Sequence, residues 1–355
     1  MSSQSDLAPG VVIVTGASSV LGRLVTERVA ADPDVGRVIA LDQRPPTGSP
    51  AGVETHTVDL RQADLKPLFE GATAVVHLAQ TGGPDAPLEQ GDGDGALARR
   101  ILDAASSVGV EHVVLLSSAV VYGAWANNPV PLTEDAPLRP NPGVGIASEK
   151  AELERTAADW RDAHPAATVA LLRPTVTVAS EGNGWLARAL ARSGALPVAA
   201  EDPPAQFLDV ADLATAVDLA RRARLDGPFN VAPDGWASGE TVRSLAGGAP
   251  RVRLPERLAL RLADLGWRWR LAPTPPALLP FTVHPWVIAN DRLRAEGWEP
   301  ASSNEEAYVS AHRASPWATL SPRRRQELAL GAAGLAVIGS VALGATAMVR
   351  RRRRR

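Results

Sequence analysis

The chain of 355 residues has no cysteine, two lysines and two tyrosines. Without cysteine it has no disulfide bond, no thiolate metal ligand and no cysteine nucleophile, and we predict no metal site. Chemistry that needs an amine is confined to Lys66 and Lys150, because arginine takes almost every other basic position. Chemistry that needs a phenol is confined to Tyr122 and Tyr308.

Net charge is distributed unevenly along the chain. The net charge is −2, but residues 316–355 hold nine arginines and one glutamate, so the other residues carry −10. An acidic body argues against nucleic acid as a partner. The first ten residues lack the basic start and apolar run of a signal peptide, so we expect the body of the protein in the cytoplasm.

Short apolar runs alternate with segments of helical spacing. Because strands buried on both faces read as continuous apolar runs, this alternation predicts an α/β fold: a Rossmann-like, doubly wound parallel sheet. The predicted strands are 11–14, 38–41, 73–78, 112–116 and 168–172. The predicted helices are 20–31, 62–70, 95–108, 147–163, 185–193 and 211–223.

The amino-acid composition changes after about residue 174, where proline and tryptophan become frequent. We predict a dinucleotide-binding domain over 1–174 and a smaller substrate-binding region over 175–315, partly interleaved with the sheet. A linker (316–327), an apolar helix (328–349) and a poly-arginine tail (350–355) are expected to follow.

The apolar segment 328–349 has 22 residues without a charge. As a helix it would be about 33 Å long, enough for a bilayer core of roughly 30 Å. The sequence therefore predicts a transmembrane helix that associates the protein with membrane lipid. A helix lying in the interface, with its arginines on anionic lipid, and a buried core helix are the alternatives. Small residues every four positions suggest a homodimer: Ala332, Ala336, Ser340 and Gly344.

The string TGASSVLG (15–22) joins the first predicted strand to the first predicted helix. Gly16 suits a tight turn, Gly22 lets the helix pack close to the sheet, and helix amides would face a pyrophosphate. Asp42 ends the second strand, where a carboxylate accepts hydrogen bonds from ribose hydroxyls. This favours NAD over NADP, although nearby Arg44 leaves NADP open, and Asp42 could instead be a strand-end cap.

With these motifs, the chain resembles the extended short-chain dehydrogenase/reductase family of the NAD-dependent epimerase/dehydratase type. The resemblance rests on TGASSVLG (15–22), LD (41–42), VDL (58–60), VVHLAQ (75–80), LLSSAVVYG (115–123), LLRPTV (171–176), FLDVADLATAV (207–217), FNVAP (229–233) and NDRLRAEGW (290–298). It implies that Asp59 and Leu60 flank the adenine and that Leu78 and Ala79 line the nicotinamide ribose. The cofactor-binding residues implied are Gly16, Ser19, Val20, Leu21, Gly22, Asp42, Asp59, Leu60, Leu78, Ala79, Lys150 and Pro174.

The chain departs from the family pattern at its middle glycine. That position falls at Ser19, or at Val20 if the turn is of the shorter type. We expect weakened rather than abolished cofactor binding.

Enzymes of this family use a tyrosine as general acid/base, a lysine one helical turn later and a serine that orients the substrate oxygen. Ser118 and Lys150 match the serine and the lysine, but the tyrosine position is Ile146, which cannot transfer a proton. Tyr122 is a weak substitute. Two carboxylates are alternative acids: Glu149 and Asp92.

The substrate is a small molecule, and Ala205 stands where nucleotide-sugar enzymes of the family often have an arginine. Tryptophans line an apolar pocket or pack in the core: Trp185, Trp236, Trp267, Trp269 and Trp286.

Two hypotheses for the function follow. The first is a membrane-tethered epimerase/dehydratase or oxidoreductase acting on an apolar or lipid-linked alcohol or ketone. The second is a catalytically lapsed NAD-binding sensor or scaffold at the membrane.

Overall fold

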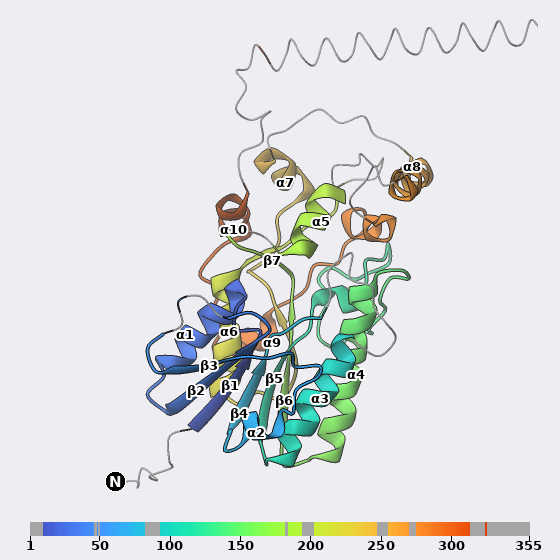
Figure 1. The fold of residues 1–355 in the computed structure, drawn as a ribbon. Helices are drawn as coiled ribbons and strands as arrows, with labels where there is room; N and C mark the ends of the chain where they lie inside the picture. Colours follow the sequence, from blue (N-terminus) through green and yellow to red (C-terminus); the bar gives the residue numbers. More distant parts are fainter. Residues whose placement is uncertain are drawn as a thin grey trace, which may run out of the picture.

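The computed structural model describes residues 10–45, 48, 50–81, 93–181, 184–193, 202–246, 255–269, 275–312 and 324. A seven-stranded parallel sheet, with the order β3-β2-β1-β4-β5-β6-β9, forms its centre (Figure 1). Its strands are β1 (Gly10–Thr15), β2 (Val35–Asp42), β3 (Val53–Thr57), β4 (Ala74–His77), β5 (His112–Leu116), β6 (Thr168–Pro174) and β9 (Gly227–Val231). The predicted doubly wound parallel sheet is confirmed.

Helices cover both faces of this sheet and form much of a smaller layer beyond it. They are α1 (Val20–Ala30), α2 (Lys66–Phe69), α3 (Asp94–Ser107), α4 (Gly145–Ala163), α5 (Trp185–Ser193), α6 (Val210–Arg222), α7 (Gly239–Leu245), α8 (Glu256–Arg268), α9 (Asp291–Ala295) and α10 (Asn304–Ala311), with 3₁₀ turns η1 (Ala119–Tyr122) and η2 (Pro276–Thr282). The predicted helix over 62–70 is only the single turn α2, since Pro67 is tolerated only in the first turn of a helix.

Alternate residues of each strand point to opposite faces of the sheet. Val12 and Val14 therefore pack with α1 and α6, whereas Ile13 packs with α3 and α4. Figure 1 shows these two helix pairs on opposite sides of the sheet. The central strands β1, β4, β5 and β6 are mostly apolar because both of their faces are buried.

Two strands of the main sheet, β3 and β9, were not predicted from the sequence. β3 has the sequence VETHT and lies at the sheet edge, where all five of its side chains keep some contact with solvent. β9 contains Pro228 and Asn230, so neither strand has a continuous apolar run. β9 and α6 follow residue 174 but belong to the main sheet layer, so the chain after residue 174 is shared between two regions.

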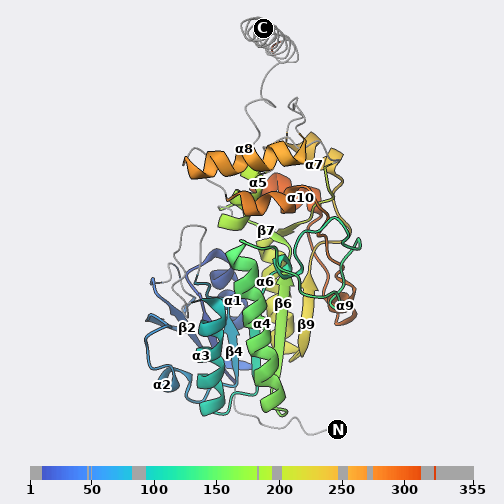
Figure 2. The ribbon, with the colours of Figure 1, turned by 90° about the vertical axis from the view of Figure 1, so that its right-hand side faces the viewer.

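A smaller layer lies beyond the carboxyl ends of the main strands. It contains α5, α7, α8, α10 and a two-stranded parallel sheet of β7 (Val176–Val178) and β8 (Phe207–Asp209) (Figure 2). The predicted linker, apolar segment 328–349 and tail 350–355 lie outside the described residues, apart from Arg324. Within the described part of the chain, no helix has the length and apolarity needed to cross a membrane.

Two histidines buried in the main sheet make stability depend on pH. Burial lowers the pKa of His77 and of His112 from 6.5 to about 4, so both are neutral when folded. Between pH 7 and pH 5 the unfolded chain binds the protons that the folded chain excludes. We expect urea denaturation to show the free energy of unfolding falling by about 2 kcal/mol for each histidine over this range.

The variant His112→Asn is the control for this expectation. It should remove about half of the pH-dependent loss, because only His77 would remain to be protonated on unfolding. The same slope in the variant and the native chain would contradict the assignment. Carboxylates whose pKa is lowered, such as Asp94, lose their contribution only at more acidic pH.

Candidate functional site

A cavity of about 690 Å³ opens at the carboxyl ends of the strands, where the strand order reverses between β1 and β4. Open α/β sheets bind ligands at such a switch point. Most of the predicted cofactor residues line this cavity: Gly16, Ser19, Val20, Leu21, Asp42, Leu60, Leu78, Ala79, Lys150 and Pro174. Gly22 and Asp59 do not line it, although both support residues that do.

The glycine turn fits the close approach of a dinucleotide. Gly16 has a φ of 74°, and a Cβ there would lie 2.6 Å from the backbone nitrogen of Ala79. A Cβ on Gly22 would lie 2.1 Å from the carbonyl oxygen of Gly16. Gly22 thus acts by letting α1 pack against the turn, which leaves the start of the helix facing the cavity.

Ser19, the departure from the family glycine, is the N-cap of α1. Its Oγ accepts a hydrogen bond from the Gly22 amide at 2.9 Å and donates one to the Gly16 carbonyl at 2.8 Å. Its φ of −72° is available to any residue. A glycine is therefore not required here for backbone conformation, and the serine stabilises the turn that holds the helix amides in place.

Asp42 is placed both to cap the end of its strand and to accept hydrogen bonds from a ribose. Its Oδ2 accepts from the Ser18 amide at 2.9 Å and its Oδ1 from the Arg44 amide at 3.1 Å, while the carboxylate lines the cavity. Each carboxylate oxygen keeps a second acceptor site for a ribose hydroxyl. Asp59 accepts from Gln43 Nε2 at 3.0 Å and pairs with Arg61 at 3.2 Å, and these two partners line the cavity.

Lys150 is held by a buried carboxylate that sequence reasoning missed. Its Nζ lies 2.7 Å from Asp94 Oδ2 and donates to the Leu116 carbonyl at 2.9 Å, and the two side chains are 1% and 6% exposed. Asp94 also accepts from the amide and hydroxyl of Thr81. Burial opposes ionisation of Asp94, but Lys150 and Thr81 together hold the pKa of its carboxyl below the usual range.

The only sequence signal for Asp94 is an acidic residue in the string DGDGA, at the start of a helix. We expected a role for Asp92 in the same string, and Asp92 lies outside the described residues. Other polar cavity residues lie in the quoted motifs or next to them, but the sequence gives them no role: Gln80, Thr81, Ser117, Thr175 and Thr177.

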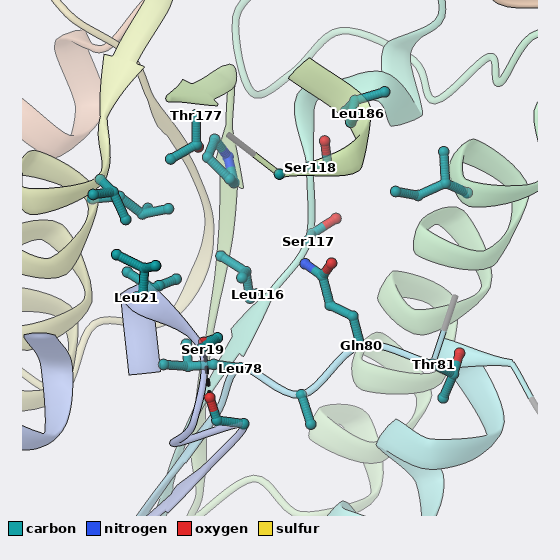
Figure 3. Close-up of a pocket in the computed structure, with 18 of the residues that line it drawn as sticks. Ser19, Leu21, Leu78, Gln80, Thr81, Leu116, Ser117, Ser118, Thr177 and Leu186 are labelled. Atoms are coloured by element: carbon teal, nitrogen blue, oxygen red, sulfur yellow. Dashed lines mark hydrogen bonds between the residues drawn. The ribbon is translucent and has the colours of Figure 1, made fainter. Parts of the chain in front are cut away.

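The cavity brings Ser118, Ile146 and Lys150 together. In Figure 3 the side chains of Gln80, Ser117 and Ser118 lie along the cavity, with apolar Leu116 and Leu186 beside them. Among the described residues that line the cavity there is no tyrosine, histidine or glutamate, and its one aspartate is Asp42. The site can orient a substrate oxygen through a serine, but Ile146, at the position where we predict the family tyrosine, has no proton to transfer.

Tyr122 belongs to a separate buried network instead. Its hydroxyl donates to Asn230 Oδ1 at 2.8 Å and accepts from Arg173 at 2.6 Å. Arg173 forms an ion pair with Glu154 at 2.6 Å, and Glu154 also accepts from the Ser117 hydroxyl. Burial raises the pKa of Tyr122 to about 12. The Tyr122 phenol therefore fixes the fold and does not line the cavity.

Glu149, another candidate acid, is also absent from the described lining of the cavity. Its carboxylate lies against the start of α3, where a Cβ added to Gly93 would come within 1.6 Å of Oε2. Burial raises the pKa of Glu149, and so do the nearby carboxylates of Glu152 and Asp94. Within the described part of the chain there is no group of three histidine, aspartate or glutamate side chains that could hold a metal ion.

A second cavity of about 210 Å³ adjoins the first and shares with it Thr175, Val176, Val178 and Ala187. Its walls are mostly apolar side chains: Leu190, Ala191, Pro203, Pro204, Ala205, Phe207, Val242, Ala246, Phe281, Trp286 and Val287. Its Arg243 pairs with Asp202 at 3.0 Å. Gln206 is engaged by the backbone of Gly235 and Ile288.

The tryptophan prediction holds for one described side chain. Trp286 is buried and lines the second cavity. Trp236 and Trp269 are instead 43% and 70% exposed, and Trp267 is half-buried outside the cavity walls. The side chain of Trp185 lies outside what the structure describes.

The fold and the site define an NAD-type epimerase or dehydratase scaffold, and comparison with known proteins agrees. A family model described as the NAD dependent epimerase/dehydratase family matches residues 12–232. The chain therefore belongs to this family, which confirms the resemblance drawn from the motifs. The predicted cofactor, NAD, agrees with the family's description.

The uncharacterized protein Rv0501 of Mycobacterium tuberculosis is 28% identical over 238 residues, which cover 64% of this chain and 63% of that protein. The match thus spans less than two thirds of the relative's length. A UDP-glucose 4-epimerase of Thermus thermophilus, in complex with NAD, has a TM-score of 0.62 and 22% identity over 85% of this chain and 97% of its own. A dTDP-glucose 4,6-dehydratase of Bacillus anthracis, also with NAD, has a TM-score of 0.61 and 14% identity over 85% and 95%. These likenesses support the fold.

Proposed function

We propose that the chain is an NAD-dependent enzyme of the epimerase/dehydratase or dehydrogenase class that acts on an alcohol or ketone group of an apolar substrate. The observation that carries the proposal is that the cavity lined by the glycine turn, Ser118 and Lys150 adjoins the mostly apolar second cavity and shares four wall residues with it. The family's structures in complex with NAD support NAD as the cofactor of this chain.

The residues present fit this cofactor. The start of α1 would receive the pyrophosphate, and Asp42 would receive the adenosine ribose hydroxyls. Lys150 Nζ has three hydrogens, of which Asp94 and Leu116 engage two, so one remains for the nicotinamide ribose. When bound, NAD accepts or returns a hydride. Ser118 would hold the substrate oxygen by a hydrogen bond while the surrounding leucines exclude water.

The walls of the second cavity support an apolar substrate over a nucleotide sugar. Ala205 offers no charge to a diphosphate, and Arg243 is already paired with Asp202. We further propose that the apolar segment 328–349 and its flanking arginines hold the enzyme at a membrane, with the body on the cytoplasmic side. A lipid-linked alcohol or ketone would then be within reach of the site.

Calorimetry with NAD and NADP tests the cofactor assignment. We expect NAD to bind more tightly, and Asp42→Ser to weaken NAD by about 10- to 100-fold, because a charged hydrogen-bond acceptor is lost. The same variant should favour NADP, since Arg44 and Arg61 remain to meet a 2′-phosphate. Asp103→Ser, on an exposed position of α3, is the matched control. If neither dinucleotide binds, the proposed function is wrong.

Turnover separates this function from a second candidate, a catalytically lapsed NAD-binding sensor or scaffold at the membrane. Ile146 at the tyrosine position favours that candidate. Formation of reduced NAD from a panel of apolar secondary alcohols, lost in Ser118→Ala, would support the enzyme. NAD binding without turnover of any alcohol or ketone in the panel would support the sensor.

A further inference from the structure

Helix α8 presents an apolar stripe to solvent. Leu258, Leu262, Leu265 and Trp269 are 43%, 45%, 49% and 70% exposed. Their spacing of four, three and four residues places them along one side of the helix. The buried side of α8 is different, because Ala259 packs against Leu279 and Val283 near η2.

Arginines accompany the stripe. Arg261 and Arg268 are exposed on α8 and project, by helical spacing, along one border of the apolar side. Arg268 has an ion pair with Asp264 at 3.0 Å, but both side chains are about half exposed or more, so the pair holds the arginine only weakly. A leucine stripe bordered by arginines and ending in tryptophan is typical of helices that lie in a membrane interface.

The position of α8 agrees with this pattern. Figures 1 and 2 show α8 and α10 at the same end of the molecule, away from the main sheet. The sequence beyond α10 contains four arginines (Arg313 and Arg323 to Arg325), the uncharged segment 328–349 and six further arginines. The stripe consists of four side chains, whereas each side of a stable protein–protein interface has about 20–30 residues.

We propose that the stripe of α8 (Leu258, Leu262, Leu265 and Trp269) inserts into the interface of a bilayer that contains anionic lipid. Because η2 packs on α8 and also contributes Phe281 and Thr282 to the second cavity, this contact sets the apolar cavity beside the bilayer. This inference rests on the proposed function, because a bilayer contact beside the second cavity would serve an enzyme whose substrate is apolar or lipid-linked.

The absence of cysteine makes a site-specific test simple. In the full chain, Leu265→Cys and Leu260→Cys are each labelled with a small fluorophore and mixed with phosphatidylcholine vesicles containing phosphatidylglycerol and nitroxide-labelled lipid. Leu260 is the matched control: it lies on the same helix, is 37% exposed and projects nearly opposite to the stripe. We expect nitroxides in the upper acyl region to quench the label at position 265 several-fold more than the label at 260.

Equal quenching at the two positions on vesicle-bound protein would overturn the proposal. So would shielding of the position 265 label without vesicles that increases with protein concentration, since a second copy would then cover the stripe. Leu262→Gln and Trp269→Gln, added together to Leu265→Cys, should abolish the preferential quenching. NAD affinity should be unchanged in this variant, which shows that it folds. Preferential quenching in a chain that binds no NAD would refute the proposed function and leave the membrane contact standing.

Discussion

Replacement of Asp94 by alanine is expected to lower the free energy of unfolding by about 3–5 kcal/mol, the usual loss when one partner of a buried ion pair is removed. In the native chain the Lys150 side chain is 1% exposed, and its ammonium contacts Asp94 and the Leu116 carbonyl. In the variant only the carbonyl would remain of these two partners. Urea denaturation at pH 7 measures this loss. The variant should also bind NAD more weakly, because Lys150 would no longer be fixed beside the cavity.

The double variant Asp94→Ala/Lys150→Met distinguishes the cost of an unpaired buried charge from the other effects of losing the Asp94 side chain. It should recover most of the lost stability, since no unpaired charge remains buried. Asp103→Ala, on the same helix but exposed, should change stability by no more than about 0.5 kcal/mol. The pKa of Asp94 is lowered on folding, so its contribution is present above a pH of about 4 and is lost at lower pH. An Asp94→Ala variant as stable as the native chain at pH 7 would contradict this account of the pair.

Introduction of a phenol by Ile146→Tyr is expected to raise turnover by about 10²- to 10⁴-fold, the usual contribution of a positioned general acid or base. Position 146 lies one helical turn before Lys150 and lines the cavity with Ser118. Steady-state formation of reduced NAD from an apolar secondary alcohol measures the gain. A new ionisation in the pH profile of kcat should accompany it.

Two controls decide what causes any gain at position 146. Ile146→Phe adds the ring without the hydroxyl and should give no gain. Ser118→Ala in the Ile146→Tyr background should remove the gain, because the substrate oxygen would lose its hydrogen bond. A gain that Ile146→Phe reproduces would mean that cavity shape, not proton transfer, limits the rate. Turnover that appears only with the tyrosine would identify the native chain as a lapsed enzyme.

Local patterns in the sequence predicted those parts of the fold whose stability is decided locally. Runs such as VVIV at 11–14 are apolar because both faces of the central strands are buried, and so they are readable. β3 at the edge and β9 with its buried Asn230 are strands because of their neighbours in the sheet. Their residues alone carry no such signal.

The same distinction holds for the site. Gly16, Ser118 and Lys150 stand in motifs whose spacing along the chain is fixed, and the cavity contains all three. The contact between Lys150 and Asp94 joins two helices that are distant in sequence, so no spacing rule predicts it. The sequence leaves Tyr122 as a weak substitute for the family tyrosine, but only the folded structure shows its hydroxyl held between Asn230 and Arg173.

Two buried ion pairs, one helical turn apart, join helix α4 to its neighbours. Helix α4 supplies the cation of one pair and the anion of the other. Lys150 binds a carboxylate of α3, and Glu154 binds a guanidinium of β6. Ile146 is the next position on this row of side chains, and its side chain has no polar atom with which to join either pair. The two ion pairs that hold the cavity wall are thus independent of residue 146, where we predict the family tyrosine. Substitution at position 146 is therefore expected to change the chemistry available in the cavity while the residues predicted to hold the dinucleotide keep their places.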